Sequence, residues 1–193
     1  MSQTSEPATD TEPVLKPRLI VVSGQAGSGK TTLAHQLARQ IGCPAICRDE
    51  IKEGMVHAHG PGFQADVSDP LTQRTYPLFF DVLRMLLEGG VTVVAEAAFQ
   101  HPLWERGLDP LLPLGRLRVI RCVTSADEMQ RRRRRRLAEV ATRAAHADHT
   151  MTGAGTGVPT PWDAIHLDVP TLDVDTTNDY RPEIADVVAF AAE

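Results

Sequence analysis

The sequence predicts an α/β fold in which a five-stranded parallel sheet is covered by helices on both faces. Short apolar runs alternate along the chain with segments whose apolar residues recur every three or four positions. Strands that alternate with helices form parallel sheets with helices on both sides. The length of 193 residues suits a single domain. Hydrophobic residues make up 42% of the chain and charged residues 23%, which is typical of a globular protein.

The strands are expected where apolar residues follow one another without interruption. Residues 18–23 (RLIVVS) form such a run, which is typical of a strand buried on both faces of a sheet. The same pattern predicts four further strands, at residues 45–47, 91–95, 117–123 and 171–175.

Four helices are expected around these strands. Residues 30–41 carry Leu33, Leu37 and Ile41 at helical spacing. Three more segments are predicted as helices, at residues 72–88, where two glycines follow, at residues 126–145 and at residues 182–192.

Two segments lack the patterns of a packed core. Residues 1–17 are rich in Ser, Thr, Glu and Pro, so we expect a disordered leader ahead of a domain that spans 18–193. Residues 146–162 are rich in Gly, Thr and Pro and are expected to be a mobile loop, part of a lid over about 126–162. No run reaches the roughly 18 apolar residues of a membrane helix, and a cytoplasmic protein without membrane contact is expected.

Charge and cysteine content exclude some classes of protein. The net charge of −5 disfavours a protein that coats nucleic acid, because such proteins carry an excess of Lys and Arg. Cys43, Cys47 and Cys122 are odd in number and are interpreted as free thiols in a reducing compartment. A zinc site that uses the first two remains the alternative.

A phosphate-binding motif follows the first predicted strand. The residues read Gly24-Gln25-Ala26-Gly27-Ser28-Gly29-Lys30-Thr31 and fit the pattern G-x-x-x-x-G-K-[ST] at every fixed position. Backbone N–H groups of this P-loop would surround phosphate oxygens, and Lys30 would reach the β- and γ-phosphates. The Thr31 hydroxyl would ligate magnesium, and Thr32 would assist at the α-phosphate. Residues 24–32 are therefore the predicted nucleotide site.

Other parts of the sequence separate the classes of P-loop protein. The guanine-recognition sequence Asn-Lys-x-Asp is absent from the chain, which disfavours a GTPase. The chain is also small for a motor or a ring-forming ATPase. A compact phosphotransferase that uses ATP and Mg²⁺ is the class that remains.

Two acidic residues are expected at the carboxyl edge of the sheet, where α/β proteins assemble their sites. Asp49 follows the second strand and could take a proton from an acceptor hydroxyl, the alternative being a helix N-cap. Glu96 ends the third strand and resembles a Walker B carboxylate that holds magnesium, usually through water. The alternative for Glu96 is an ion pair with a nearby Lys or Arg.

Residues 131–136 are six consecutive arginines on a predicted helix. At about 100° per residue they point in every direction, so the helix cannot be packed on all sides. As part of a lid, Arg132, Arg135 and Arg136 are candidates to neutralise charge on the transferred phosphoryl group. Salt bridges with acidic surface residues and nucleic-acid binding are the alternatives.

Two weaker groups of candidates lie near these residues in the sequence. One group could reach phosphate or substrate, with no metal assigned to it: Arg143, His146 and His149. The other could line an acceptor pocket, although aromatic residues usually belong to the core: Phe63, Phe99 and Trp104.

With these residues the chain resembles the P-loop kinase group that includes chloramphenicol phosphotransferase, the kinase half of polynucleotide kinases and the zeta-toxin-like kinases of the AAA type. Residues 48–55 (RDEIKEGM) look like the segment that supplies their catalytic aspartate, so the resemblance gives Asp49 that role. The Arg-rich helix looks like their lid, and residues 169–177 are similar to their last strand and the loop that touches adenine. Residues 54–70 match no member closely enough to identify the acceptor.

The expected function is transfer of the γ-phosphate of ATP to a hydroxyl of a small molecule, such as an antibiotic, a nucleoside or another metabolite, by a monomer or homodimer. A polynucleotide 5′-hydroxyl kinase is one alternative, and it would bind single strands through the arginines. A non-catalytic ATP-binding regulatory module is the other.

Overall fold

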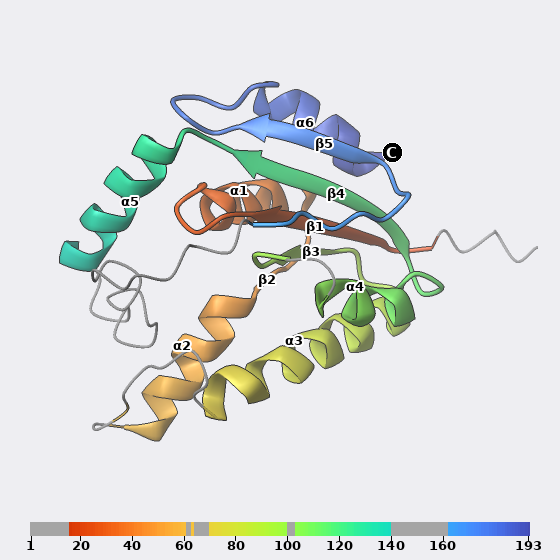
Figure 1. The fold of residues 1–193 in the computed structure, drawn as a ribbon. Helices are drawn as coiled ribbons and strands as arrows, with labels where there is room; N and C mark the ends of the chain where they lie inside the picture. Colours follow the sequence, from red (N-terminus) through yellow and green to blue (C-terminus); the bar gives the residue numbers. More distant parts are fainter. Residues whose placement is uncertain (1–15, 61–62, 64–69, 100–102, 140–161) are drawn as a thin grey trace, which may run out of the picture.

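Five parallel strands form the centre of the molecule in the computed structural model, which describes residues 16–60, 63, 70–99, 103–139 and 162–193. Their order across the sheet is β2-β3-β1-β4-β5 (Figure 1). The strands are β1 (Arg18–Gly24), β2 (Ala45–Cys47), β3 (Val93–Glu96), β4 (Arg116–Val123) and β5 (Thr171–Asp175). The predicted α/β class and the five-stranded parallel sheet are therefore confirmed.

Helices cover both faces of this sheet (Figure 1). On one face lie α1 (Lys30–Ile41) and α6 (Ile184–Ala192), and on the other lie α3 (Pro70–Glu88), α4 (Leu103–Leu108) and the short 3-10 helix η1 (Asp109–Leu111). Two helices extend past the sheet. They are α2 (Arg48–His59), which packs against α3, and α5 (Ala126–Glu139).

The central strand explains the unbroken apolar run at the start of the domain. Along β1, Leu19 and Val21 belong to the core under α3 and α4, whereas Ile20 and Val22 belong to the core under α1. All four side chains are essentially inaccessible to solvent. Successive side chains of a strand point to opposite faces, so a strand covered on both sides is apolar throughout.

Some element boundaries differ from the prediction. The strand expected at 91–95 begins at Val93, because the N–H group of Val91 still bonds to the carbonyl of Leu86 at the end of α3. The helix expected at 182–192 begins at Ile184. The helix expected at 126–145 is present to Glu139, and the rest of it lies outside the described residues, as do residues 1–15 of the expected leader and residues 140–161 of the expected lid.

Two helices were not predicted, α2 and α4. The buried residue of α2 is a lysine, Lys52. A helix that extends from the sheet edge has little core to face, so the usual periodic signal is weak. Within the described segments, no helix combines the length and the apolar character that crossing a membrane requires.

Candidate active site

The predicted P-loop connects β1 directly to α1. Gly29 has φ 83° and is the N-cap of α1, so Lys30 is the first helical residue. Gly24 has φ 150°, and a Cβ there would lie 2.6 Å from Ser28 Oγ and 2.7 Å from the carbonyl oxygen of Cys122. Gly27 has φ 89°, and a Cβ there would lie 2.7 Å from the carbonyl oxygen of Met129 in α5. Glycine is therefore required in this loop both by its positive φ angles and by the close packing of α5 against it.

Replacement of Gly27 by Ala is expected to lower both the thermal unfolding temperature and the affinity for ATP. A non-glycine residue in this left-handed conformation costs about 1–3 kcal/mol, and the clash with Met129 adds to it. Gly54 in α2 is the matched control, because a Cβ there would meet no atom within 4 Å. Gly54→Ala is expected to raise the unfolding temperature, since Gly in a helix costs roughly 0.5–1 kcal/mol relative to Ala. Shifts of the same sign for both variants would contradict this account.

Lys30, Thr31 and Glu96 converge at the foot of the P-loop. The Thr31 hydroxyl donates to Glu96 Oε2 at 3.0 Å, and Lys30 Nζ lies 3.5 Å from Glu96 Oε1. Glu96 at the end of β3 is only 1% exposed. The ion pair considered as an alternative for Glu96 is thus present, and it involves the lysine of the P-loop itself.

The electrostatics of Glu96 reflect this crowded position. Burial raises the pKa of the Glu96 carboxyl above its usual value, Lys30 and Thr31 oppose the rise, and the negative charge of Asp49 adds to it. A carboxylate beside a threonine hydroxyl provides the hard oxygen ligands that Mg²⁺ prefers. The donor set therefore fits the predicted magnesium site, with Thr31 and Glu96 as the residues that would hold the ion.

Asp49 lies at the carboxyl end of β2, next to β3 in the sheet. It is the second residue of α2, and Cys47 occupies the N-cap position without a side-chain cap hydrogen bond. The alternative that Asp49 caps this helix is therefore wrong. Arg48 Nη1 donates to Asp49 Oδ1 at 3.1 Å. The Asp49 side chain is 39% exposed, so its carboxylate has access to solvent.

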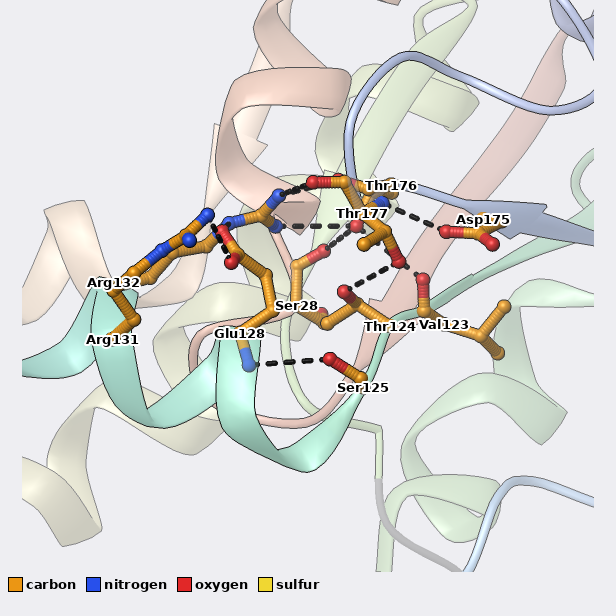
Figure 2. A network of polar contacts seen from close by, with 10 residues as sticks. All are labelled: Ser28, Val123, Thr124, Ser125, Glu128, Arg131, Arg132, Asp175, Thr176 and Thr177. Carbon is orange, nitrogen blue, oxygen red and sulfur yellow. Dashed lines mark hydrogen bonds and ion pairs between the residues drawn. The ribbon is translucent and has the colours of Figure 1, made fainter.

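The Arg-rich helix α5 begins with a network that ties it to the end of β5 (Figure 2). Arg132 Nε donates to Glu128 Oε1 at 2.6 Å, and its Nη2 nitrogen donates to the carbonyl oxygens of both Thr176 and Thr177. Thr176 Oγ1 in turn donates to the carbonyl oxygen of Ser28 at 2.6 Å. Arg132 therefore connects α5, the loop after β5 and the P-loop.

The other arginines differ in their surroundings. Arg131 pairs with Glu128, and Arg133 Nε donates to the carbonyl oxygen of Ala26 in the P-loop at 2.9 Å. Arg135 lines the cavity described below. The side chain of Arg136 lies outside the described residues. The alternative of salt bridges thus applies to Arg131 and Arg132, and the phosphate contacts assigned to Arg132, Arg135 and Arg136 remain predictions.

Removal of the Arg132 side chain is expected to weaken both folding stability and ATP binding. Hydrogen bonds to charged groups contribute about 1.5–3 kcal/mol each to stability. Arg132→Ala would also remove one of the positive charges that pair with the Glu128 carboxylate, which is only 8% exposed. Arg134 on the same helix is exposed, so Arg134→Ala should change the free energy of unfolding by no more than about 0.5 kcal/mol. Chemical denaturation of both variants measures the difference. Equal losses in the two variants would refute the anchoring role.

A cavity of about 990 Å³ opens beside the P-loop. It lies between the P-loop, the start of α1, the helix α5 and the loop that follows β5. The residues that line it are Gly27, Gly29, Lys30, Thr31, Thr32, Gln36, Arg132, Arg135, Thr176, Asn178, Asp179, Tyr180, Arg181, Glu183 and Ile184. A cavity of this size is large enough for a nucleotide.

The residue-by-residue prediction missed one wall of this cavity, which is formed by Gln36 and by residues 178–181, 183 and 184. Residues 169–177 were expected to form the last strand and a loop that touches adenine. The turn that follows them carries no sequence motif, so it was not predicted. An antiparallel bridge between Asp175 and Arg181 folds this turn back over the cavity. The Thr177 N–H donates to Asp175 Oδ1 at 2.7 Å. An aspartate two residues before the N–H group that it accepts from is a known turn signal, and this signal could have indicated the turn after β5.

The weaker candidates separate into three groups. Phe99 and Trp104 are buried in the core under α3, so the prediction that they line an acceptor pocket is wrong for these two. Phe63 is half-buried, with Lys52 Nζ 5.8 Å from its ring centroid. Arg143, His146 and His149 lie outside the described residues. The three cysteines are free, with Cys47 and Cys122 buried.

Comparison with known proteins assigns the chain to a family. A family model described as AAA domain matches residues 19–153. A candidate kinase from Chloroflexus aurantiacus J-10-fl is 26% identical, with a TM-score of 0.74 over 92% of this chain and 97% of that chain. No curated protein matches the sequence.

Two more distant solved structures share the fold. The APS kinase CysC of Mycobacterium tuberculosis, solved with AMPPNP and APS, is 15% identical, with a TM-score of 0.65 over 93% of this chain and 99% of that chain. A sugar kinase from Janibacter sp. HTCC2649 is 16% identical, with a TM-score of 0.61 over 91% and 95%. With its P-loop, its parallel sheet and the matched family model, the chain belongs to the AAA domain family and has the fold of the P-loop kinases.

Proposed function

We propose that this protein transfers the γ-phosphate of ATP to a hydroxyl group of a small-molecule acceptor, with Mg²⁺ as the metal. The observation that carries the proposal is the convergence of Lys30, Thr31 and Glu96 at the P-loop, with Asp49 two residues beyond Cys47, which pairs with Glu96 in the sheet. A phosphate-binding lysine, two oxygen ligands for a metal and a solvent-accessible carboxylate are the parts that phosphoryl transfer needs.

Each residue has a defined task in this proposal. The P-loop amides and Lys30 hold the β- and γ-phosphates, and Arg135 of α5, which lines the cavity, offsets the charge on the transferred group. Mg²⁺, held by Thr31 and Glu96, would neutralise phosphate charge when bound. Asp49 accepts the proton of the acceptor hydroxyl. A bond forms between the acceptor oxygen and the γ-phosphorus, and the bond from that phosphorus to the β,γ-bridging oxygen breaks, which releases ADP.

A small molecule is favoured over a nucleic acid as the acceptor. The nucleic-acid alternative rests on the arginine run, yet Arg131, Arg132 and Arg133 are occupied by Glu128, by the loop after β5 and by the P-loop. The net charge of −5 also opposes binding to a phosphate backbone. Two of the solved structures with this fold are named as kinases of small molecules, a sugar kinase and an APS kinase, which agrees with this choice.

Transfer of radiolabelled γ-phosphate from Mg·ATP tests the proposal. A panel of sugars, nucleosides and hydroxylated antibiotics is offered beside a 5′-hydroxyl oligonucleotide. Label on a small molecule is the expected result. Label on the oligonucleotide alone would overturn the acceptor class, and tight ATP binding without transfer to any acceptor on a broad panel would favour a regulatory module.

A further inference from the structure

Three metal-ligating side chains that the phosphoryl transfer does not use meet at the edge of the sheet. His35 comes from the second turn of α1, Cys47 from the last position of β2 and Glu50 from the first turn of α2. One ligand atom of each lies within 4.8 Å of the other two. Side chains that are distant in the sequence are thus brought together by the packing of α1 against the β2–α2 connection.

The distance between Cys47 and His35 matches that of a tetrahedral zinc site, and the distance between His35 and Glu50 is shorter. Cys47 Sγ lies 3.7 Å from His35 Nε2, and ligand bonds of about 2.3 Å to sulfur and 2.0–2.1 Å to nitrogen would place these atoms about 3.6 Å apart. His35 Nε2 lies 2.6 Å from Glu50 Oε1, so this pair has to open by roughly 0.7 Å to admit an ion with Zn–N and Zn–O bonds of that length. Both side chains are substantially exposed, at 39% and 48%, and can move by that amount.

The cysteine gives the cluster a fixed inner ligand. Cys47 is only 2% exposed, and its backbone is held in the sheet by parallel pairing in which it stands opposite Glu96. The exposed imidazole and carboxylate leave a path for an ion to enter from solvent. The cluster thus combines a sulfur ligand fixed in the sheet, Cys47, with two solvent-exposed ligands that can move, His35 and Glu50.

The chemistry of the three ligands selects a class of metal. Thiolate and imidazole favour zinc-like transition metals, whereas Mg²⁺ prefers oxygen ligands alone. The cluster is therefore chemically distinct from the Thr31–Glu96 pair, although β-sheet pairing places Cys47 beside Glu96. With three protein ligands, a fourth position stays open to water.

We propose that His35, Cys47 and Glu50 form a binding site for one zinc-type divalent transition-metal ion, separate from the magnesium site. The thiol proton is released to solvent when the ion binds, because the ligand is the thiolate. The zinc alternative considered from the sequence used Cys43 with Cys47, but the cluster takes its other ligands from α1 and α2. Cys43 lines a different, smaller cavity with Arg18 and Ile41.

Titration of the full chain with Co²⁺, in the absence of nucleotide, tests this site directly. The expected result is a thiolate-to-cobalt charge-transfer band that saturates at one ion per chain and disappears when Zn²⁺ is added. His35→Ala is expected to weaken cobalt binding by at least tenfold, and its exposed side chain makes loss of folding a minor concern. Cys47→Ser should abolish the band, whereas Cys43→Ser should leave it unchanged.

Several outcomes would overturn the proposal. They are the absence of a thiolate band in the wild-type chain, a band that depends on Cys43 instead of Cys47, and equal cobalt affinity in wild type and His35→Ala. None of these readouts involves phosphoryl transfer. A failure of the metal site is therefore distinguishable from a failure of the proposed kinase activity, and a chain without kinase activity could still show the site.

Discussion

The Lys30→Ala variant is expected to lose phosphoryl transfer by about a hundredfold to a thousandfold, on the scale of removing a preorganised donor from developing charge. Lys30 is the first residue of α1, is 8% exposed and lines the cavity beside the P-loop. Its ammonium group is proposed to contact the β- and γ-phosphates. The measurement is the initial rate of label transfer at saturating ATP, with Lys16→Ala as the exposed-lysine control.

This variant also removes the counter-charge of a buried carboxylate. Lys30 Nζ lies 3.5 Å from Glu96, and breaking a buried pair by removing one partner costs about 3–5 kcal/mol. A loss of activity could then reflect partial unfolding. The double variant Lys30→Ala with Glu96→Gln, compared with Glu96→Gln alone, separates the two effects. The neutral amide needs no counter-charge, and the single variant accounts for loss of the proposed magnesium ligand.

The expected pattern is a lowered unfolding temperature for Lys30→Ala that the second substitution largely restores, together with phosphoryl transfer in the double variant far below that of Glu96→Gln alone. If the double variant transferred phosphate as fast as Glu96→Gln alone, Lys30 would be a structural partner of Glu96 and the assignment of the phosphate site would be wrong. Normal turnover of Lys30→Ala would have the same meaning.

The sequence was most informative where the site is contiguous. Residues 24–31 carry the whole phosphate-binding pattern in one segment between a strand and a helix, and the structure has that strand, turn and helix. Asp49 and Glu96 could be placed because both follow strands, and the carboxyl ends of parallel strands share one edge. Asp49 and Glu96 are 47 positions apart in the sequence, but a predicted parallel sheet is enough to place them at the same edge.

The parts that could not be predicted depend on how helices dock. The contacts of Arg133 with Ala26 and of Arg132 with Thr176 are set by the position of α5, which no local pattern specifies. One ion pair of α5 could have been predicted from the sequence, because Glu128 and Arg132 are four residues apart on a predicted helix. Phe99 and Trp104 lie near acidic candidates in the sequence, yet tertiary packing places them in the core.

The Asp49→Asn variant is expected to lower the turnover number by about 10²–10⁴-fold, the range that a general base contributes. Asparagine keeps the size of the side chain and can still accept a hydrogen bond from Arg48, but it cannot take up the acceptor proton. Asp81→Asn is the matched control, because Asp81 is an exposed aspartate on α3 and should leave turnover unchanged.

Binding of Mg·ATP is expected to survive in Asp49→Asn or to become tighter. The negative charge of Asp49 is one of the causes that raise the pKa of Glu96, so its removal favours the ionised form of the proposed magnesium ligand. A damaged fold would weaken binding and turnover together, whereas loss of a base lowers turnover alone. Isothermal titration with a non-hydrolysable ATP analogue, set beside the rate of label transfer, distinguishes these cases. Unchanged turnover would show that Asp49 takes no part in the mechanism. Its role would then be structural, because an acidic side chain in the first turn of α2 stabilises the helix.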